Sequence, residues 1–213
     1  MDRFGLIGFP ISHSQSPAMF ARAYGGRFAY DLIETPDFEE AMRLLANCYK
    51  AVNVTAPFKI AAAKAADHAS PEVGRTGAAN ILVNTPDGIW AYNSDYLAVR
   101  KIILDADPSD IAVVGFGGAG KAALAAAQDC GIETRLYRHD GIADGISADL
   151  VIYTLPSAVP GIEKIGCRAL LEANYKDPCL TGRPGYIPGT RWHMEQALAG
   201  FPLMTGEPPT GLL

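Results

Sequence analysis

Short apolar runs alternate with amphipathic stretches through the first half of the chain. The apolar runs have the length and the β-branched or aromatic content of strands, and they lie at residues 4–9, 28–34, 51–55, 78–83 and 89–92. Apolar residues at helical spacing, with prolines at several starts, predict helices at residues 17–24, 37–46, 58–67 and 95–106. This alternation predicts a mainly parallel sheet that is covered on both faces.

The second half opens on a strand, a glycine-rich turn and a helix. An apolar run at residues 111–114 leads directly into Gly-Phe-Gly-Gly-Ala-Gly, which fits G-x-G-x-x-G, and an alanine-rich run at residues 121–128 follows. This order is the context that a dinucleotide-binding fingerprint requires. The free N–H groups and the dipole at the helix start favour phosphate. The residues that we predict to bind the cofactor phosphates are Gly115, Gly117, Gly118, Ala119 and Gly120. A glycine-rich turn without a ligand is the alternative.

Two further stretches are predicted to be strands, and they lie at residues 133–138 and 148–156. A Gly/Pro-rich stretch at residues 182–189 predicts a loop, and the chain becomes helical from residue 190.

The alternation of elements predicts an α/β protein with two domains. We expect an N-terminal, mainly parallel α/β domain over residues 1–100, completed by a C-terminal helix over residues 190–213. A Rossmann-type dinucleotide-binding domain is expected over residues 101–189.

The composition is typical of a soluble globular protein and makes some classes of partner unlikely. The chain has 213 residues, of which 49% are hydrophobic and 19% charged, and a net charge of −5. The absence of a basic excess argues against nucleic acid as a partner. No apolar run is long enough to span a bilayer and no signal-peptide pattern is present, so we expect a cytoplasmic protein. The four cysteines lack the spacing of a metal site.

Polar residues gather after two of the predicted strands in the first half. Ser14 and Ser16 follow the first strand, whereas Asn53, Thr55 and Lys59 surround the end of the third. In open α/β sheets, ligands bind beyond the carboxyl ends of the strands. Each residue alone has an ordinary interpretation, as a cap, a loop residue or a solvated lysine. Together they suggest a polar pocket for a hydroxylated anion.

Six short motifs in a fixed order extend this interpretation. The first half carries G-F-P-I-S-H-S-Q-S-P at residues 8–17, V-N-V-T-A-P-F-K at 52–59, G-A-A-N at 77–80 and Y-N-S-D at 92–95. The glycine turn follows, and G-T-R-W-H-M-E-Q at residues 189–196 is similar to a closing helix motif, G-L-x-M-L-x-x-Q. In this combination the chain resembles the shikimate dehydrogenase family over nearly its whole length.

The resemblance implies an activity and a set of site residues. It implies reduction of 3-dehydroshikimate to shikimate by a nicotinamide cofactor, with the N-terminal domain binding the substrate. The implied catalytic pair is Lys59 and Asp95, in which the ammonium stabilises the developing alkoxide and supplies the proton while the carboxylate orients it. The implied substrate-binding residues are Ser14 and Ser16 for the carboxylate, Thr55, Asn80 and Gln196 for the hydroxyls, and Tyr175. The resemblance also implies a strand at residues 170–175 that ends in this tyrosine. Gly189 matches a position near the nicotinamide.

The end of the strand at residues 133–138 bears on the choice of cofactor. Basic groups there would hold a 2′-phosphate, whereas an acidic group would bond a ribose hydroxyl. The family usually has N-R-T at this point, and this chain has Arg138, His139 and Asp140. Arg138 and His139 favour NADP as the cofactor, whereas Asp140 leaves NAD as an alternative. A charged turn with no ligand role is the third possibility.

The chain also departs from the family pattern. It is shorter after Asp140, where the helix that normally intervenes is expected to be reduced to a loop, and Trp192 replaces a methionine near the nicotinamide position. Two alternatives therefore stay open: a quinate/shikimate dehydrogenase that uses NAD, and a non-catalytic ligand-binding paralogue. The sequence does not decide between a monomer and a homodimer.

Overall fold

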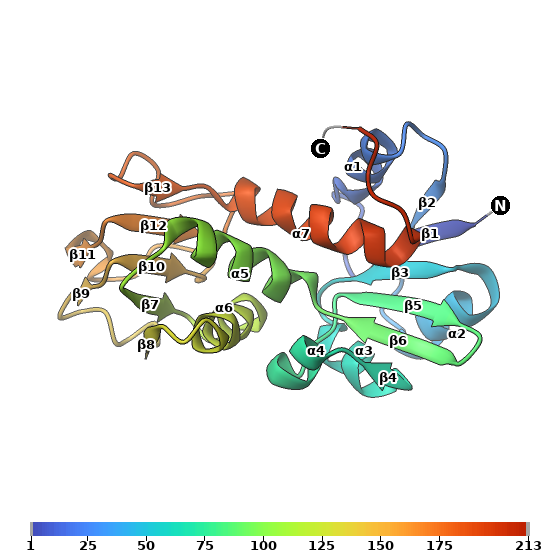
Figure 1. Cartoon of the computed structure of the whole chain (residues 1–213), viewed down its shortest axis with the longest axis horizontal. Helices are drawn as coiled ribbons and strands as arrows, with labels where there is room; N and C mark the ends of the chain where they lie inside the picture. Colours follow the sequence, from blue (N-terminus) through green and yellow to red (C-terminus); the bar gives the residue numbers. More distant parts are fainter. Residues whose placement is uncertain (1, 212–213) are drawn as a thin grey trace. The chain divides into compact units, whose positions relative to one another are not determined.

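Two compact units make up the protein, whose residues 2–211 are described here by a computed structural model (Figure 1). The first unit comprises the chain up to Ser94 together with the residues from Ala197 onward, and the second comprises Asp95–Gln196. A mixed sheet forms the first unit and a parallel sheet the second. The predicted α/β fold class, a mainly parallel N-terminal sheet followed by a Rossmann-type sheet, is confirmed.

The sheet of the first unit has the strand order β2-β1-β3-β5-β6-β4. Its strands are β1 (Arg3–Gly8), β2 (Ala29–Glu34), β3 (Ala51–Val54), β4 (His68–Ala69), β5 (Ile81–Thr85) and β6 (Gly88–Tyr92). Strand β1 is parallel to both β2 and β3, whereas β5 is antiparallel to β3 and β6. The carboxyl ends of β1 and β3 therefore lie at the same edge, side by side.

Helices cover both faces of this sheet because successive side chains of a strand point to opposite faces. They are α1 (Ser16–Ala23), α2 (Phe38–Cys48), α3 (Lys59–Ala65), α4 (Pro71–Thr76) and the last part of α7 (Gly189–Thr205). Phe4 packs in a cluster with residues of α1 and with Phe201 of α7. Ile7, three positions along β1, packs in the opposite cluster with residues of α2, α3 and α4, such as Leu45.

The sheet of the second unit has the order β13-β12-β10-β7-β8, and all of its described pairs are parallel. Its strands are β7 (Asp110–Val114), β8 (Glu133–Tyr137), β10 (Leu150–Tyr153), β12 (Ala169–Glu172) and β13 (Tyr186–Ile187). Two-residue strands β9 (Ile146–Ser147) and β11 (Ile165–Gly166) form a separate small sheet.

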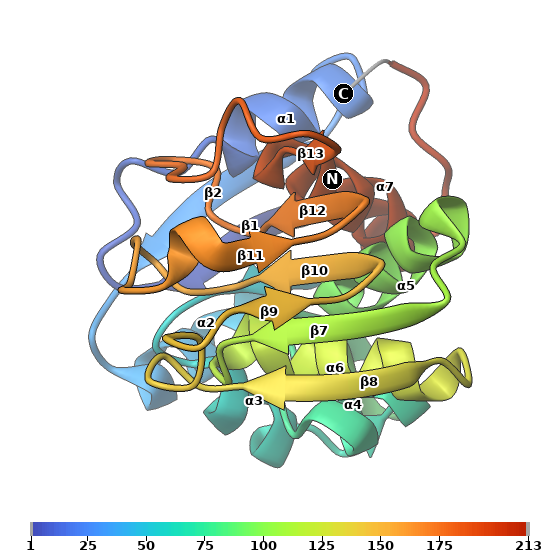
Figure 2. The same cartoon turned by 90° about the vertical axis from the view of Figure 1, so that its left-hand side faces the viewer.

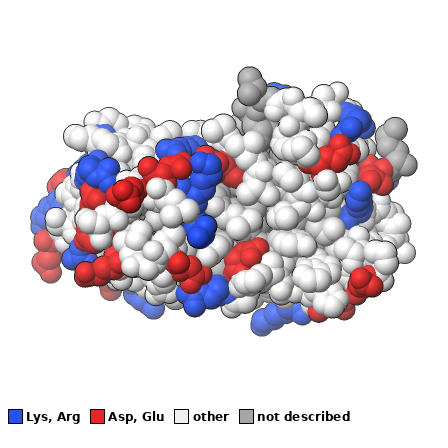
Figure 3. Space-filling model, in the orientation of Figure 1, with Lys and Arg blue, Asp and Glu red and all other residues white. Residues whose placement is uncertain are grey.

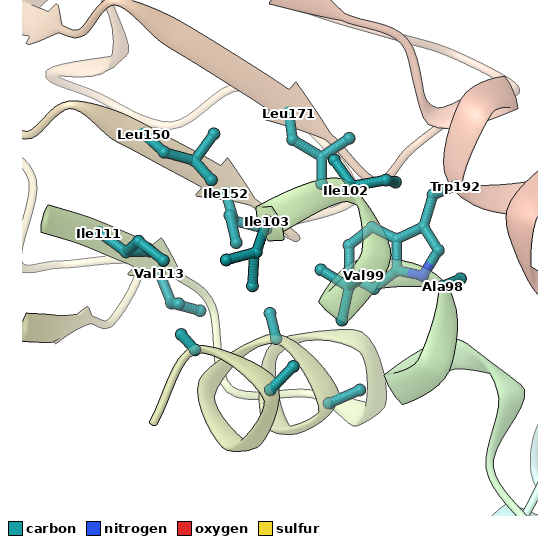
Figure 4. Close-up of a cluster of buried hydrophobic side chains, with 14 of the residues drawn as sticks. Ala98, Val99, Ile102, Ile103, Ile111, Val113, Leu150, Ile152, Leu171 and Trp192 are labelled. Atoms are coloured by element: carbon teal, nitrogen blue, oxygen red, sulfur yellow. The ribbon is translucent and has the colours of Figure 1, made fainter. Parts of the chain in front are cut away.

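One face of the parallel sheet is covered by helices. These are α5 (Ser94–Ala106), α6 (Gly118–Asp129) and the first part of α7. Figure 4 shows the indole of Trp192 pointing into this cluster beside Val99 of α5. Trp192 is only 5% exposed, and its Nε1 donates to the backbone oxygen of Asp95 at 3.1 Å. The tryptophan therefore acts as a core residue that joins α7 to the start of α5.

No α-helix of the described chain covers the other face of this sheet. Figure 2 shows β9 and β11 lying over this face, on the side opposite α5 and α6. The buried side chains there come from short segments and include Ile142, Ile146 and Leu180. The prediction that a loop replaces the helix between β8 and β10 is confirmed. The stretch at residues 182–189, which was predicted to be a loop, also contains the two-residue strand β13, which pairs with β12.

Charged side chains of both signs are mixed on the surface. Figure 3 shows lysines and arginines next to aspartates and glutamates on the visible face. Ion pairs account for part of this mixing, for example Arg191–Asp105 at 2.6 Å and Lys101–Asp105 at 2.7 Å. Within the described residues, no helix has the length and apolar character needed to cross a membrane.

Candidate functional site

The polar residues after β1 and β3 are brought to one edge of the first unit. Two backbone hydrogen bonds tie the loops together there, from the N–H of Phe9 to the oxygen of Ala56 (3.1 Å) and from the N–H of Thr55 to the oxygen of Ile7 (2.9 Å). The segments that carry the predicted residues Ser14, Ser16, Thr55 and Lys59 all leave the sheet at this edge. The clustering that the sequence suggested is therefore present within this unit.

A chain of hydrogen bonds runs from the serine pair toward the middle of the sheet. The Ser14 hydroxyl donates to the Ser16 hydroxyl at 3.1 Å and accepts the Ser16 N–H at 3.2 Å. The Tyr30 hydroxyl donates to Oδ1 of Asn53 at 2.8 Å. Burial raises the pKa of Tyr30, and a hydrogen bond with Ser16 opposes this rise. Tyr30 therefore stays protonated at neutral pH and acts as the hydrogen-bond donor to Asn53, close to the serine pair.

Asn80 lies at the far end of this chain and is almost fully buried. Its backbone oxygen accepts Nδ2 of Asn53 at 3.4 Å. Its side chain holds Ser94, because Oδ1 accepts the Ser94 N–H at 2.8 Å and Nδ2 donates to the Ser94 hydroxyl at 3.1 Å. Ser94 is the first residue of α5 and precedes Asp95. Asn80 therefore fixes the start of the helix that carries one of the predicted catalytic residues.

Lys59 and Thr55 are placed by the turn that begins α3. The N–H of Phe58 donates to the Thr55 oxygen at 2.9 Å, and Lys59 is the first helical residue. The Lys59 oxygen accepts the N–H of Ala79 at 2.9 Å, which ties the lysine backbone to the residue before Asn80. Lys59 is partly buried. Backbone bonds thus hold the lysine next to the polar network.

The sequence analysis did not identify Tyr30 and Ser94 as members of the network, and it noted Asn53 without assigning it a role. Tyr30 and Ser94 had not been singled out, because an aromatic in a strand and a serine before a helix have ordinary structural interpretations. Asn53 carried the stronger signal. It lies between Val52 and Val54 in a fully buried strand, and a buried amide requires hydrogen-bond partners.

The glycine-rich turn of the second unit is closely packed on its inner side and open on its outer side. Gly115 has a φ of +99°, and a Cβ on Gly120 would lie 2.1 Å from the Gly115 oxygen. These two positions need glycine to form the turn. A Cβ on Gly117 or Gly118 would meet nothing within 4 Å, so the outer face of the turn is open. Gly117 caps α6 without a side-chain hydrogen bond, which leaves the first N–H groups of the helix for an anion.

Two cations flank an exposed aromatic ring beside this turn. The ring centroid of Phe116 lies 5.5 Å from Nζ of Lys121 and 5.7 Å from Cζ of Arg138. Arg138 directly follows β8, whose carboxyl end adjoins that of β7. In the described part of the chain, no carboxylate forms an ion pair with Lys121 or Arg138. Both positive charges are therefore held at the turn by cation–π contacts rather than neutralised. His139 and Asp140 follow Arg138 and are exposed.

Tyr175 lies in a loop and not at the end of a strand, so the predicted strand at residues 170–175 is too long. Strand β12 ends at Glu172 because Asn174 bends the chain, its Oδ1 accepting the N–H groups of Lys176 (3.1 Å) and Asp177 (3.2 Å). The amide of Asn174 also donates to the oxygens of Pro156 (2.9 Å) and Asp177 (2.8 Å). Tyr175 is thus presented on an ordered turn.

Glu172 anchors the same loop from inside the second unit. Its carboxylate is fully buried and accepts the N–H groups of Cys179 at 2.6 Å and Leu180 at 3.2 Å. The Tyr186 hydroxyl donates to it at 3.0 Å. Burial, and next the hydrogen bond to Glu172, raise the pKa of Tyr186 to about 12. The acid is therefore a structural clamp on the loop that follows β12.

Known proteins match the sequence that builds this site. The model of the shikimate dehydrogenase substrate binding domain matches residues 6–82. Shikimate dehydrogenase (NADP(+)) of Anaeromyxobacter sp. (strain K) is 31% identical over 218 residues, which cover 93% of this chain and 77% of that protein. The chain belongs to the shikimate dehydrogenase family. Matches within the family differ in extent: Shikimate dehydrogenase (NADP(+)) of Aromatoleum aromaticum is 36% identical over 135 residues, covering 58% of this chain and 48% of that relative.

A solved structure extends the family likeness to the fold. Shikimate 5-dehydrogenase from Thermus thermophilus, in complex with NADP(H) and shikimate, gives a TM-score of 0.85 at 25% identity. The comparison covers 98% of this chain and 95% of that chain. The two-sheet architecture described above is thus that of a shikimate dehydrogenase.

In this member of the shikimate dehydrogenase family, the predicted site residues divide between the two compact units. The first unit holds Ser14, Ser16, Thr55, Lys59 and Asn80. The second unit holds Asp95, Tyr175, Gly189 and Gln196 together with the predicted cofactor-binding residues, which are Gly115, Gly117, Gly118, Ala119, Gly120, Arg138 and His139. Asp95 lies in the first turn of α5, and Gly189 and Gln196 both lie on α7.

Proposed function

We propose that this protein is a shikimate dehydrogenase that reduces 3-dehydroshikimate to shikimate with NADPH, in the reversible reaction of aromatic amino-acid biosynthesis. The observation that carries the proposal is that two hydrogen-bonded groups, the pair Ser14–Ser16 and the series Tyr30–Asn53–Asn80, lie beside Lys59 at one edge of the sheet. The relatives named above, which are NADP-dependent shikimate dehydrogenases, support it. The first unit would bind the substrate and the second the dinucleotide.

The network is suited to a polyhydroxylated acid. Ser14 and Ser16 would donate to the substrate carboxylate, since hydrogen bonds between the two residues already hold the pair together. Thr55 would bond a ring hydroxyl, as would the amides of Asn80 and Gln196 and the phenol of Tyr175. A site built to hydrogen-bond several hydroxyls discriminates strongly against analogues that lack them, because its polar groups are then left unpaired.

Lys59 would perform the proton transfer. As hydride reaches the ring carbon, the carbonyl oxygen gains negative charge, and an ammonium beside it stabilises that charge and delivers a proton. Asp95 would orient the lysine ammonium through a charge-assisted hydrogen bond. The dinucleotide, when bound, supplies the hydride.

The cation pair beside the glycine turn favours NADP. Arg138 and Lys121 carry unneutralised charge next to Phe116, at the strand end where a ribose 2′-phosphate would lie. Asp140 favours the second candidate, a quinate/shikimate dehydrogenase that uses NAD, because an exposed carboxylate two residues later can bond a 2′-hydroxyl. The third candidate is a non-catalytic ligand-binding paralogue.

Initial rates of the purified protein separate these candidates. Shikimate and quinate are each oxidised with NADP and with NAD, and formation of the reduced nicotinamide is followed by absorbance. We expect turnover of shikimate that is faster with NADP. Faster turnover with NAD, or of quinate, would favour the second candidate. No turnover with any pair, together with calorimetric binding of shikimate, would favour the third.

Replacing Arg138 by alanine tests the cofactor assignment. We expect the KM for NADP to rise by about 10- to 100-fold, since hydrogen bonds to a charged partner contribute about 1.5–3 kcal/mol, while the KM for NAD changes little. Arg135→Ala is the matched control, because this arginine lies on the same strand but pairs with Asp110 at the opposite end. An equal rise in both KM values would argue against a 2′-phosphate contact.

A further inference from the structure

An aromatic stack in the second unit involves a histidine to which the motifs assign no role. The rings of Tyr175 and His193 lie 4.8 Å apart, centroid to centroid, at an interplanar angle of 14°. Tyr175 comes from the loop after β12, whereas His193 comes from the first turns of α7, the helix that also carries Gln196. Nearly parallel rings at this separation attract each other beyond their buried area.

The stack supplies an orientation that Tyr175 lacks otherwise. Asn174 and Glu172 fix the backbone of the loop, but Tyr175 itself is 39% exposed. Its hydroxyl makes no hydrogen bond to any residue of the described chain. An exposed ring of this kind is free to rotate about its side-chain bonds. The flat face of His193 removes that freedom on one side, so the ring direction depends on the histidine.

We propose that His193 is a positioning residue for the reaction, which holds the Tyr175 ring so that its hydroxyl is directed at the bound substrate. This inference rests on the proposed function. The histidine would act on substrate affinity through the tyrosine and would not touch the reacting atoms. The substrate concerned is the hydroxylated carboxylic acid of the proposed reaction.

Kinetics of His193→Ala and His193→Phe test the proposal. Loss of the stack is expected to raise the KM for shikimate by about 3- to 10-fold in the alanine variant, which corresponds to the strength of an aromatic pair. The value of kcat and the KM for NADP should change by less than about twofold. Phenylalanine keeps a flat ring and should restore the wild-type KM. A merely structural role of the histidine would not separate KM from kcat in this way.

Two controls make the result specific. His68→Ala removes a similar stack, on Trp90 at 4.8 Å in the first unit, and should leave the KM for shikimate unchanged. In a Tyr175→Ala background, His193→Ala should have no further effect, because the ring to be positioned is absent. An alanine variant with wild-type KM, or one whose effect persists without Tyr175, would overturn the proposal. Wild-type protein that turns over no shikimate with either cofactor would instead overturn the proposed function.

Discussion

Replacing Lys59 by alanine is expected to lower kcat for shikimate oxidation by about 10²- to 10⁴-fold, the usual contribution of a positioned acid or base. Calorimetric affinity for shikimate should fall only a few-fold, because Ser14, Ser16 and Asn80 bring hydrogen-bonding groups of their own to the substrate. The reason is that the lysine charge matters most when the oxygen becomes an alkoxide, which happens only in the transition state.

Lys64→Ala is the matched control, since this lysine is exposed in the last turn of the same helix. It should retain wild-type kcat. A Lys59→Ala protein that binds shikimate and keeps more than about a tenth of wild-type kcat would remove the lysine from the mechanism, while leaving the family assignment intact.

Glu172→Ala is expected to destabilise the second unit by about 3–5 kcal/mol. The substitution removes the buried carboxyl group that accepts the N–H groups of Cys179 and Leu180 and the hydroxyl of Tyr186, and of these three donors the Leu180 N–H belongs to a buried residue. Hydrogen bonds to a charged group contribute about 1.5–3 kcal/mol each, and their losses are not additive.

Urea unfolding followed by tryptophan fluorescence measures this loss. Because the chain has two tryptophans, a Trp90→Phe background leaves Trp192, in the core of the second unit, as the reporter. Glu163→Ala, an exposed glutamate of the same unit, should change the unfolding free energy by less than about 0.5 kcal/mol. If Glu172→Ala behaves like Glu163→Ala, the buried carboxylate does not clamp the loop.

Elements with a strong local signal could be predicted from the sequence. The apolar run before Gly115 is short and β-branched, as a buried strand requires, and the glycines after it are required by close contacts such as that between Gly120 and the Gly115 oxygen. Helix α2 likewise has a clear start signal, since Asp37 accepts the N–H groups of Glu39 and Glu40. Such features depend on neighbours in sequence, which is why one chain suffices to find them.

Features that depend on distant residues could not be predicted. Strands β9, β11 and β13 have two residues each, too few for any periodicity, and they exist because partners elsewhere in the chain complete them. The links from Tyr30 to Asn53 and from Tyr175 to His193 join residues far apart in sequence. Composition does not reveal which serine, tyrosine or histidine receives such a partner.

The second unit is inserted within the sequence of the first, and this arrangement has a consequence for deletions. Residues 95–196 form an insertion within the other unit, whose own core includes Phe4 from before the insertion and Phe201 from after it. Deletions inside the insertion therefore remove no residue of that core. A shorter cover on one face of the parallel sheet, such as the helix-free stretch between β8 and β10, is therefore compatible with an intact serine and asparagine site in the other unit.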